Sequence, residues 1–110
     1  MATGEHDRSA FVDATFEVLA DRRRRLLLWH LEGRAGETTV DELADWLVER
    51  DPTCGDRETV AIDLYHRSLP MLAEADVVDY DSDEKTVTLT PRGQTVARVG
   101  RTVTEHLASV

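Results

Sequence analysis

The chain has 110 residues, 41% of them apolar, which is enough for one domain with a modest hydrophobic core. No apolar run approaches the roughly 18 residues that a membrane span requires, and the N-terminal stretch lacks the basic and apolar parts of a secretory signal. Cys54 is the single cysteine, which excludes an internal disulfide and leads us to expect a reducing, cytoplasmic location. Acidic residues outnumber basic ones by 22 to 13, and this excess argues partly against binding to nucleic acid.

Two helices are predicted in the first third of the chain. Residues 1–10 are polar and are expected to be flexible, and a helical pattern starts at Phe11. Asp21 is predicted to cap a second helix, which begins in the run Arg22 to Arg25 and ends at Gly33. Because four arginines at a helix start oppose the helix dipole, one continuous helix from Phe11 remains the alternative. The inward stripe of the second helix is formed by Leu27, Leu28 and Leu31.

A third helix and a turn follow. Residues 33–38 are expected to form a loop, after which Thr39 is predicted to cap a helix that runs to Arg50. Glu42, three positions after the cap, completes the pattern of a capping box. Residues 51–56 contain Pro and Gly and are predicted to connect this helix to the next one. The order of helix, turn and helix is typical of a helix-turn-helix.

The next stretch is predicted to be a long amphipathic helix from Arg57 to Ala75. Its apolar positions repeat at helical spacing and fall within one stripe: Val60, Ala61, Leu64, Tyr65, Ser68, Leu72 and Ala75. Its outward positions are Thr59, Ile62, Asp63, His66, Arg67, Pro70 and Glu74. Pro70 is expected to bend the helix, and a new helix starting near Leu69 is the alternative.

A small β-hairpin is predicted after this helix. Asp76 is expected to end the helix in the left-handed conformation, although glycine would suit that position better. Val77, Val78 and Tyr80 favour one strand and residues 86–89 a second, with a polar turn at residues 81–85 between them. A helix that feeds directly into a hairpin is the arrangement of the recognition helix and wing in a winged helix-turn-helix domain. The sequence therefore predicts an α+β, mainly α fold with a two-stranded wing over residues 11–93.

The last 17 residues, 94–110, are predicted to be a C-terminal helix with one apolar stripe. Leu26 and Trp29 point away from the inward stripe of their own helix and need a cover, which this C-terminal helix can supply within the chain or across a twofold axis. We expect a homodimer, and docking within one chain is the alternative. The predicted dimer interface consists of Leu26, Trp29, Val96, Val99, Val103 and Leu107.

Three stretches carry a resemblance to a known family. They are LYHRSLPMLAEADVVDYD at residues 64–81, the triplet at 19–21 with the four arginines and Leu27 after it, and LTPRG at residues 89–93. Over residues 11–93 the chain resembles small haloarchaeal winged-helix domains of unassigned function, and His66 to Val78 is distantly similar to metal-responsive ArsR-type repressors. Asp76 stands where such domains usually carry glycine. The acid-rich, lysine-poor composition is similarly typical of proteins from salt-loving archaea.

Double-stranded DNA is the predicted partner, and the function that follows is that of a transcriptional regulator. The helix at 57–75 would read the major groove through Arg57, Thr59, His66 and Arg67. Arg22, Arg23, Arg24 and Arg25 are candidate phosphate contacts, and ion pairs with neighbouring acids are their alternative role. Residues 37–91, however, carry 4 basic and 15 acidic residues, whereas a phosphate-binding face is usually basic. A winged-helix module that binds protein and not DNA therefore remains the alternative function.

Other chemistry has little support in the sequence. The four histidines and Cys54 are scattered and show no metal-ligand spacing, so we predict no metal and no cofactor. Glycine-rich phosphate loops and nucleophile or metalloprotease motifs are absent from the sequence. The paired acids at Asp41 and Glu42 and those at residues 81–84 are expected to be solvated, so no catalytic residue and no enzymatic activity are predicted.

Overall fold

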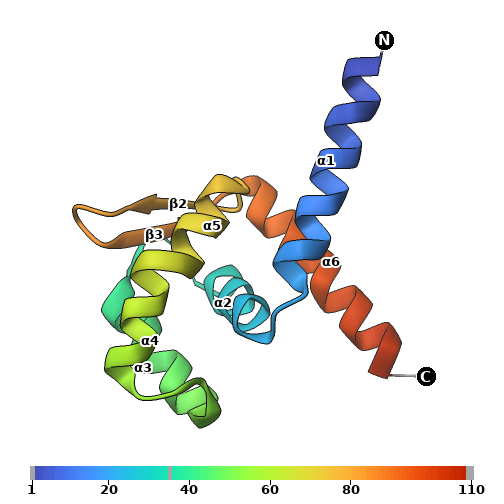
Figure 1. The fold of residues 1–110 in the computed structure, drawn as a ribbon. Coiled ribbons are helices and arrows are strands. Elements are labelled where there is room, and N and C mark those ends of the chain that lie inside the picture. The colour runs from blue at the N-terminus through green and yellow to red at the C-terminus, as the bar shows by residue number, and fades with distance from the viewer. Residues whose placement is uncertain (1, 35, 109–110) are drawn as a thin grey trace.

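The computed structural model describes residues 2–34 and 36–108, with side chains from residue 9 onward. Outside the described residues lie Met1 of the predicted flexible N-terminus, Ala35 of the predicted loop at 33–38, and Ser109 and Val110 of the predicted C-terminal helix. The fold is α+β and mainly α, with a small antiparallel sheet (Figure 1). Its helices are α1 (Ala2–Leu19), α2 (Arg22–Glu32), α3 (Val40–Arg50), α4 (Arg57–Asp63), α5 (Leu69–Glu74) and α6 (Pro91–Ala108). A 3₁₀ turn, η1 (Pro52–Cys54), precedes α4, and a π-helical segment, η2 (Leu64–Ser68), joins α4 to α5.

The sheet has three strands, not the two that the sequence predicts. Strands β2 (Val78–Asp81) and β3 (Thr86–Leu89) form the expected hairpin, with Tyr80 opposite Val87. The two-residue strand β1 (Thr38–Thr39) pairs with the other edge of β3, which gives the order β1-β3-β2. Two residues are too few to show the alternation of a strand, so the sequence predicts a loop end at Thr38 and a helix cap at Thr39.

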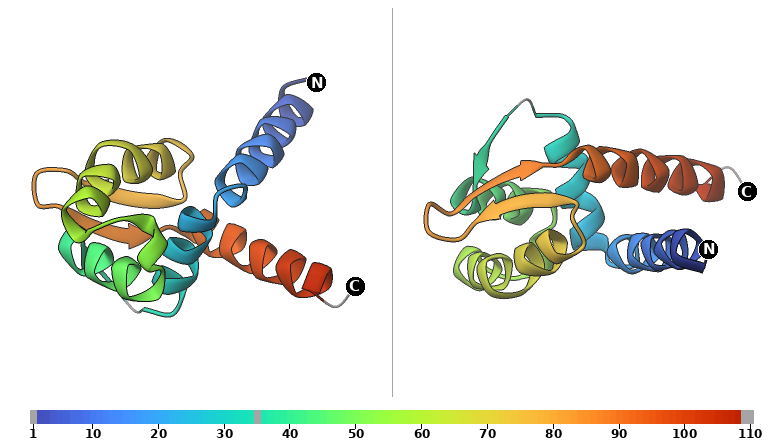
Figure 2. Two further views of the ribbon diagram at one scale, coloured as in Figure 1. Left: turned by 60° about the horizontal axis from the view of Figure 1, so that its bottom comes forward. Right: turned by 90° about the horizontal axis from the view of Figure 1, so that it is seen from above.

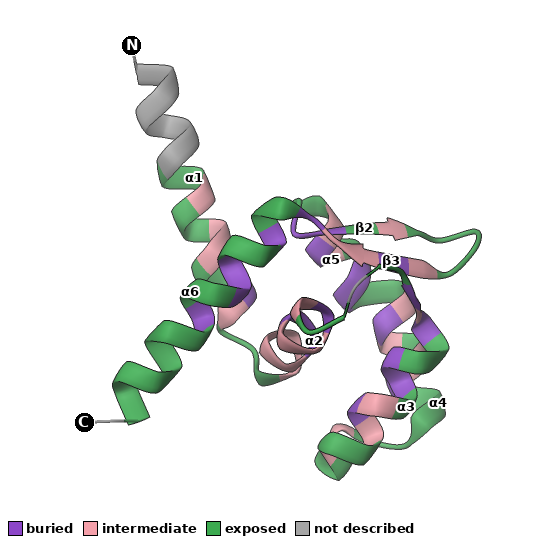
Figure 3. Cartoon of the chain, turned by 180° about the vertical axis from the view of Figure 1, so that it is seen from behind, coloured by how far each residue is buried: buried purple, intermediate pink, exposed green. Residues whose placement is uncertain are grey.

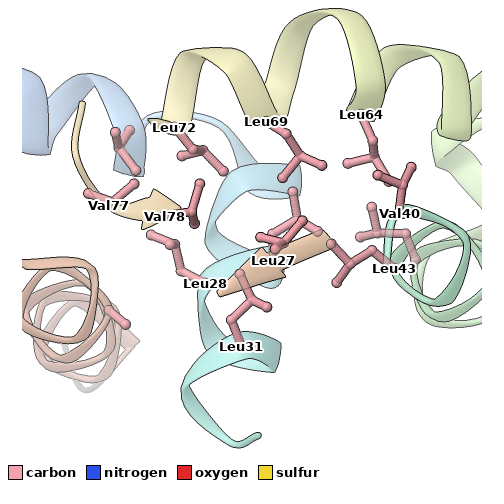
Figure 4. Close-up of a cluster of buried hydrophobic side chains, with 14 of the residues drawn as sticks. Leu27, Leu28, Leu31, Val40, Leu43, Leu64, Leu69, Leu72, Val77 and Val78 are labelled. Carbon is pink, nitrogen blue, oxygen red and sulfur yellow. The ribbon is translucent and has the colours of Figure 1, made fainter. Parts of the chain in front are cut away.

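Helix α2 lies at the centre of the molecule, and its predicted inward stripe is confirmed (Figures 1 and 4). Leu27 and Leu28 are fully buried, and they meet side chains from α3, from the α4–α5 region and from the hairpin. The close-up in Figure 4 labels this cluster: Leu27, Leu28, Leu31, Val40, Leu43, Leu64, Leu69, Leu72, Val77 and Val78. A single apolar core therefore joins α3, α4 and α5 to the hairpin through α2.

The N-terminal helix is longer than predicted. It begins at Ala2, so residues 2–10, expected to be flexible, are helical. These residues lack the apolar spacing on which the prediction relied, which is why the pattern became visible only at Phe11. The alternative of one continuous helix is wrong, because the chain breaks at Ala20 and Asp21 and the carboxylate of Asp21 caps α2 by accepting the backbone N–H of Arg24 at 3.1 Å.

The C-terminal helix docks on α2 within the same chain along its first half. The indole N–H of Trp29 donates to the carbonyl of Ala97 at 3.3 Å, and Val96 is buried. Val96, predicted at a dimer interface, is therefore part of the internal core. Beyond Gly100 the helix projects from the body and its residues are exposed (Figure 3).

Within residues 2–34 and 36–108, none of the helices has both the length and the apolar content of a membrane span.

Candidate nucleic-acid interface

The turn between α3 and α4 is built by side-chain caps. The carboxylate of Asp51 accepts the backbone N–H of Thr53 at 3.2 Å, which starts the 3₁₀ turn. Gly55 has a φ of 119°, a conformation that favours glycine, and it redirects the chain. Asp56 then caps α4 by accepting the backbone N–H of Thr59 at 2.8 Å, and this bond lowers the pKa of Asp56 below its usual value. Helices α3 and α4 pack against each other across this turn, as in a helix-turn-helix.

The predicted helix at 57–75 is helical throughout, but it is not a regular α-helix. Its middle, Leu64–Ser68, is π-helical, and α5 resumes with Pro70 in its first turn. Proline has no N–H and crowds the carbonyl four residues back. The backbone hydrogen bonds just before Pro70 therefore change from α-helical to the wider π-helical spacing. The expected distortion therefore lies in the turn before Pro70. We call the stretch of α4, η2 and α5 the reader segment.

The reader segment exposes most of the residues predicted to read DNA. Thr59 and His66 are exposed, and the side chain of Arg67 is 83% exposed, with only a long ion pair of 3.9 Å to Asp63. Ile62 lies on the same outward set, as predicted, and is 55% exposed, unusual for an apolar side chain on an α-helix. These side chains form one accessible polar and apolar stripe along α4 and η2.

Arg57 differs from the other predicted reading residues because acids on α3 hold it. Its guanidinium lies 3.2 Å from the carboxylate of Asp41 and also donates to Asp45. The bond to Asp45, followed by that to Asp41, raises the pKa of Arg57 above its usual value. Arg57 thus anchors α4 to α3, and any contact with DNA would compete with these two carboxylates.

The hairpin is tied to the reader segment by an aromatic pair that sequence reasoning missed. The rings of Tyr65 and Tyr80 meet edge to face with centroids 6.3 Å apart, and the Tyr80 hydroxyl donates to the carbonyl of Tyr65 at 3.5 Å. Lys85, at the hairpin turn, places its ammonium 5.3 Å from the centre of the Tyr65 ring. Burial raises the pKa of Tyr80 above its usual value. The aromatic pair thus joins the hairpin to the reader segment.

Two of the four consecutive arginines bond to the end of α1. Arg24 donates to the carbonyls of Val18 at 3.1 Å and Glu17 at 2.7 Å, and Arg25 donates to the carbonyl of Leu19 at 2.6 Å. The last carbonyls of a helix lack partners within the helix, and the negative end of its dipole favours cations. The unfavourable position of these arginines at the start of α2 is therefore offset at the end of α1.

The other two arginines connect α2 to the helix-turn-helix. Arg22 lies 3.1 Å from Asp51, and Arg23 donates to Asp63 at 2.6 Å and to the carbonyl of Cys54 at 3.1 Å. Burial acts to raise the pKa of Asp63, but hydrogen bonds from Ser68 at 2.7 Å and from Arg23 outweigh it, so this pKa lies below its usual value. Arg22 and Arg23 thus form the ion pairs that the sequence offered as the alternative role, whereas Arg24 and Arg25 bond to backbone carbonyls. A phosphate role for the four arginines stays a prediction.

A polar hollow of about 450 Å³ lies beside this network. It is lined by Glu17, Asp21, Arg23, Arg24, Asp63, Arg67, Ser68 and Met71. The hollow has little net charge with which to select an ion, because its three guanidinium groups are matched by three carboxylates: Arg23, Arg24 and Arg67 against Glu17, Asp21 and Asp63. Nor does any group of His, Cys, Asp and Glu suited to a metal ion occur among the residues that the structure describes.

Exposed acids surround the stripe on the reader segment. On α3 and α4 they are Asp41, Glu42, Asp45, Glu49 and Glu58, and on the hairpin they are Asp79, Asp81, Asp83 and Glu84. The acid excess seen in the sequence therefore lies at the surface of α3, α4 and the hairpin and is not buried in the core.

Residues 16–88, about two thirds of the chain, match a family model described as Domain of unknown function (DUF7344). The chain belongs to this family. Searches of curated proteins and of solved structures gave no significant match. The match runs from the last turn of α1 to Thr88 in β3, which includes the whole reader segment and all of the hairpin except Leu89.

Proposed function

We propose that the chain is a winged helix-turn-helix transcriptional regulator that binds double-stranded DNA through its reader segment. The order of α3, turn and reader segment, followed directly by the β2–β3 hairpin, supports this proposal, because winged domains present a reading helix and a wing in that order. The tyrosine pair between Tyr65 and Tyr80 adds support, since it would hold the wing at a fixed angle to a helix in the groove.

The observation that carries the proposal is the exposed stripe of Thr59, Ile62, His66 and Arg67. Arg67 can form the bidentate contact with guanine, His66 and Thr59 can bond base edges or phosphates, and Ile62 can contact a thymine methyl group. The side chain of Ile62 is 55% exposed, so it is accessible for such a contact. Arg57 would act mainly as the anchor of α4, given its two carboxylate partners.

The acids around the stripe favour a second candidate, a winged-helix module that binds protein. Nine exposed carboxylates on α3, α4 and the hairpin would repel phosphates, whereas a basic protein surface would pair with them. DNA binding therefore requires that specific contacts dominate. A saline cell interior, which we infer from the acid-rich composition, would help, because at about 1 M salt the screening length is roughly 3 Å and repulsion is confined to near contacts.

Genome-wide occupancy of the tagged full chain in its own host tests the proposal under native salt. We compare the wild type with Arg67→Ala, with the double variant His66→Ala, Arg67→Ala, and with Arg67→Lys as the matched control. Lysine keeps the charge but loses the planar fork, so it separates guanine reading from a phosphate contact. The double variant should lose the discrete peaks, and loss of one bidentate pair alone should weaken site affinity about 5- to 150-fold, equivalent to about 1–3 kcal/mol.

Each outcome of this experiment is decisive. Discrete peaks that vanish in Arg67→Ala and in Arg67→Lys support sequence reading by the guanidinium. Peaks that survive in every variant mean that the reader segment is not the contact. If the wild type shows no enrichment over an untagged control, the DNA-binding proposal is wrong and the protein-binding candidate replaces it. Circular dichroism of the purified variants checks that each one is folded.

A further inference from the structure

Exposed apolar side chains gather on the two helices that project from the body on the side away from the hairpin turn (Figure 2). Among the described residues, the large apolar side chains with the greatest exposure are Val12, Phe16, Ile62, Val99, Val103 and Leu107. All but Ile62 lie on α1 and α6, which we call the two arms. Phe16 is 65% exposed and Leu107 70%, values that a helix face covered by its own chain does not show.

The arms form an open V on one side of the body. In both views of Figure 2 they leave the body on the side away from the hairpin, and the left view shows them separating toward the two chain ends. They meet at Gly100 of α6, where a Cβ would lie 2.7 Å from a methyl group of Leu19 of α1. Two apolar hollows flank the crossing, one of about 530 Å³ that includes Phe16, Val103 and Leu107, and one of about 220 Å³ that includes Val12 and Val99.

The two arms carry opposite charge. Helix α1 contains four acidic residues and one arginine, whereas α6 contains three arginines and one acidic residue. Within the chain, Arg92 lies over the ring of Phe11 at 4.4 Å and Arg101 pairs with Glu32 at 2.6 Å, so Arg98 is the arginine of α6 that is offered to a second copy. Asp13 and Glu17 on α1 and Arg98 on α6 are exposed beside the apolar stripes. A surface with an acidic apolar arm and a basic apolar arm is complementary to itself after a twofold rotation.

We propose that two copies of this chain associate through the arms, with α1 of each copy packed along α6 of the other. Each arm of 18 residues is about 27 Å long, so each of the two α1–α6 contacts has several helical turns over which to pack. The interface buries Phe16, Val103 and Leu107 and pairs the acids of α1 with the arginine of α6. The proposal does not depend on DNA binding, and it places Leu26, Trp29 and Val96 outside the dimer interface that the sequence predicted.

The first test is the mass of the full chain in solution, measured by light scattering and sedimentation equilibrium. The wild type should have twice the 12.4 kDa of one chain. The double variant Phe16→Ser, Leu107→Ser should be a folded monomer, because both side chains are exposed within one copy. The matched control is Ile62→Ser, which removes the exposed apolar residue of α4 and should leave the dimer intact. A monomeric wild type, or a double variant that remains dimeric, overturns the proposal.

The second test addresses which helices pair. One variant reverses the acids of α1 (Asp13→Lys, Glu17→Lys), and another reverses the arginine of α6 (Arg98→Glu). Each variant alone should associate more weakly than the wild type, because like charges then face each other. A mixture of the two should recover the dimer, since reversed α1 meets reversed α6 at one contact and native arms meet at the other. If the mixture associates no better than the single variants, α1 does not pair with α6 of the second copy.

Discussion

Replacing Gly93 by alanine tests the packing of α6 against the sheet, because helix propensity and packing predict opposite results. Alanine is favoured over glycine inside a helix by up to about 1 kcal/mol, so propensity alone predicts a more stable protein. In the structure, however, a Cβ on Gly93 would lie 2.0 Å from the carbonyl oxygen of Val77 and 2.6 Å from a methyl group of Leu89. The carbonyl of Val77 is a backbone atom held by the N–H of Thr90 at 3.1 Å, so it cannot rotate away.

Relieving this overlap requires the start of α6 to move away from β2. Overpacking of this kind costs about 1–3 kcal/mol, and a clash with backbone belongs to the upper part of that range. After subtraction of the propensity gain, we expect Gly93→Ala to lower the free energy of unfolding by about 2 kcal/mol. For a domain of this size that corresponds to a fall of roughly 8–16 °C in the melting temperature.

Urea unfolding followed by circular dichroism at fixed protein concentration measures the change, since dimerisation would make stability depend on concentration. Gly33→Ala is the matched control, because a Cβ there meets its nearest atoms at 3.7 Å and φ is an ordinary −78°. The control should be neutral or gain up to about 1 kcal/mol. If Gly93→Ala is as stable as the wild type, the close approach of α6 to Val77 does not exist in solution.

Two further predictions concern the stability of the helix-turn-helix region. Because the folded-state pKa of Asp63 is depressed, its stabilisation is present above its ordinary pKa of 3.8 and is lost as the pH falls through the folded value. Asp63→Asn should therefore lower stability at neutral pH and flatten the acid limb of the unfolding profile, whereas Asp79→Asn should run parallel to the wild type. Asp76 ends α5 with a φ of 63°, so Asp76→Gly should stabilise by about 1 kcal/mol in urea unfolding. Asp76→Ala, which keeps the strained conformation, should give no gain.

Local chemistry was readable from the sequence. Asp21 caps α2, the Thr39 hydroxyl accepts the backbone N–H of Glu42, and Asp76 takes the left-handed conformation at the end of α5, all as predicted. The backbone N–H groups of Asp76 and Val77 donate to the carbonyls of Ala73 and Leu72 at 3.0 Å, the bonds of a Schellman motif. Each of these features depends on side chains within a few residues, and short-range hydrogen bonding decides it.

Features that depend on distant parts of the chain could not be predicted from the sequence. Strand β1 exists because β3 offers it an edge, and the carboxylate of Glu42 accepts the hydroxyl of Thr38 in that strand, not the reciprocal bond of a capping box. The sequence predicts Arg57 as a DNA contact, whereas in the fold its guanidinium pairs with Asp41 and Asp45. Residue spacing along the sequence does not indicate which ion pairs form between two helices. A candidate site chosen from exposed cations alone therefore includes arginines that are already paired with carboxylates of the protein.

The two proposed contacts use different elements, the reader segment in the middle of the chain and the arms at its two ends, and the charge distribution makes their responses to salt differ from those of common DNA-binding proteins. Most such proteins lose affinity steeply with salt because they neutralise many phosphates. Here the reader segment and hairpin offer few unpaired cations and many carboxylates, so salt removes repulsion as well as attraction, and the dependence should be shallow. The arms bury apolar side chains, and salts that strengthen apolar burial favour their association. A dimer with two reader segments also gains affinity by joining two weak contacts into one, which offsets the small number of cations that each segment contributes.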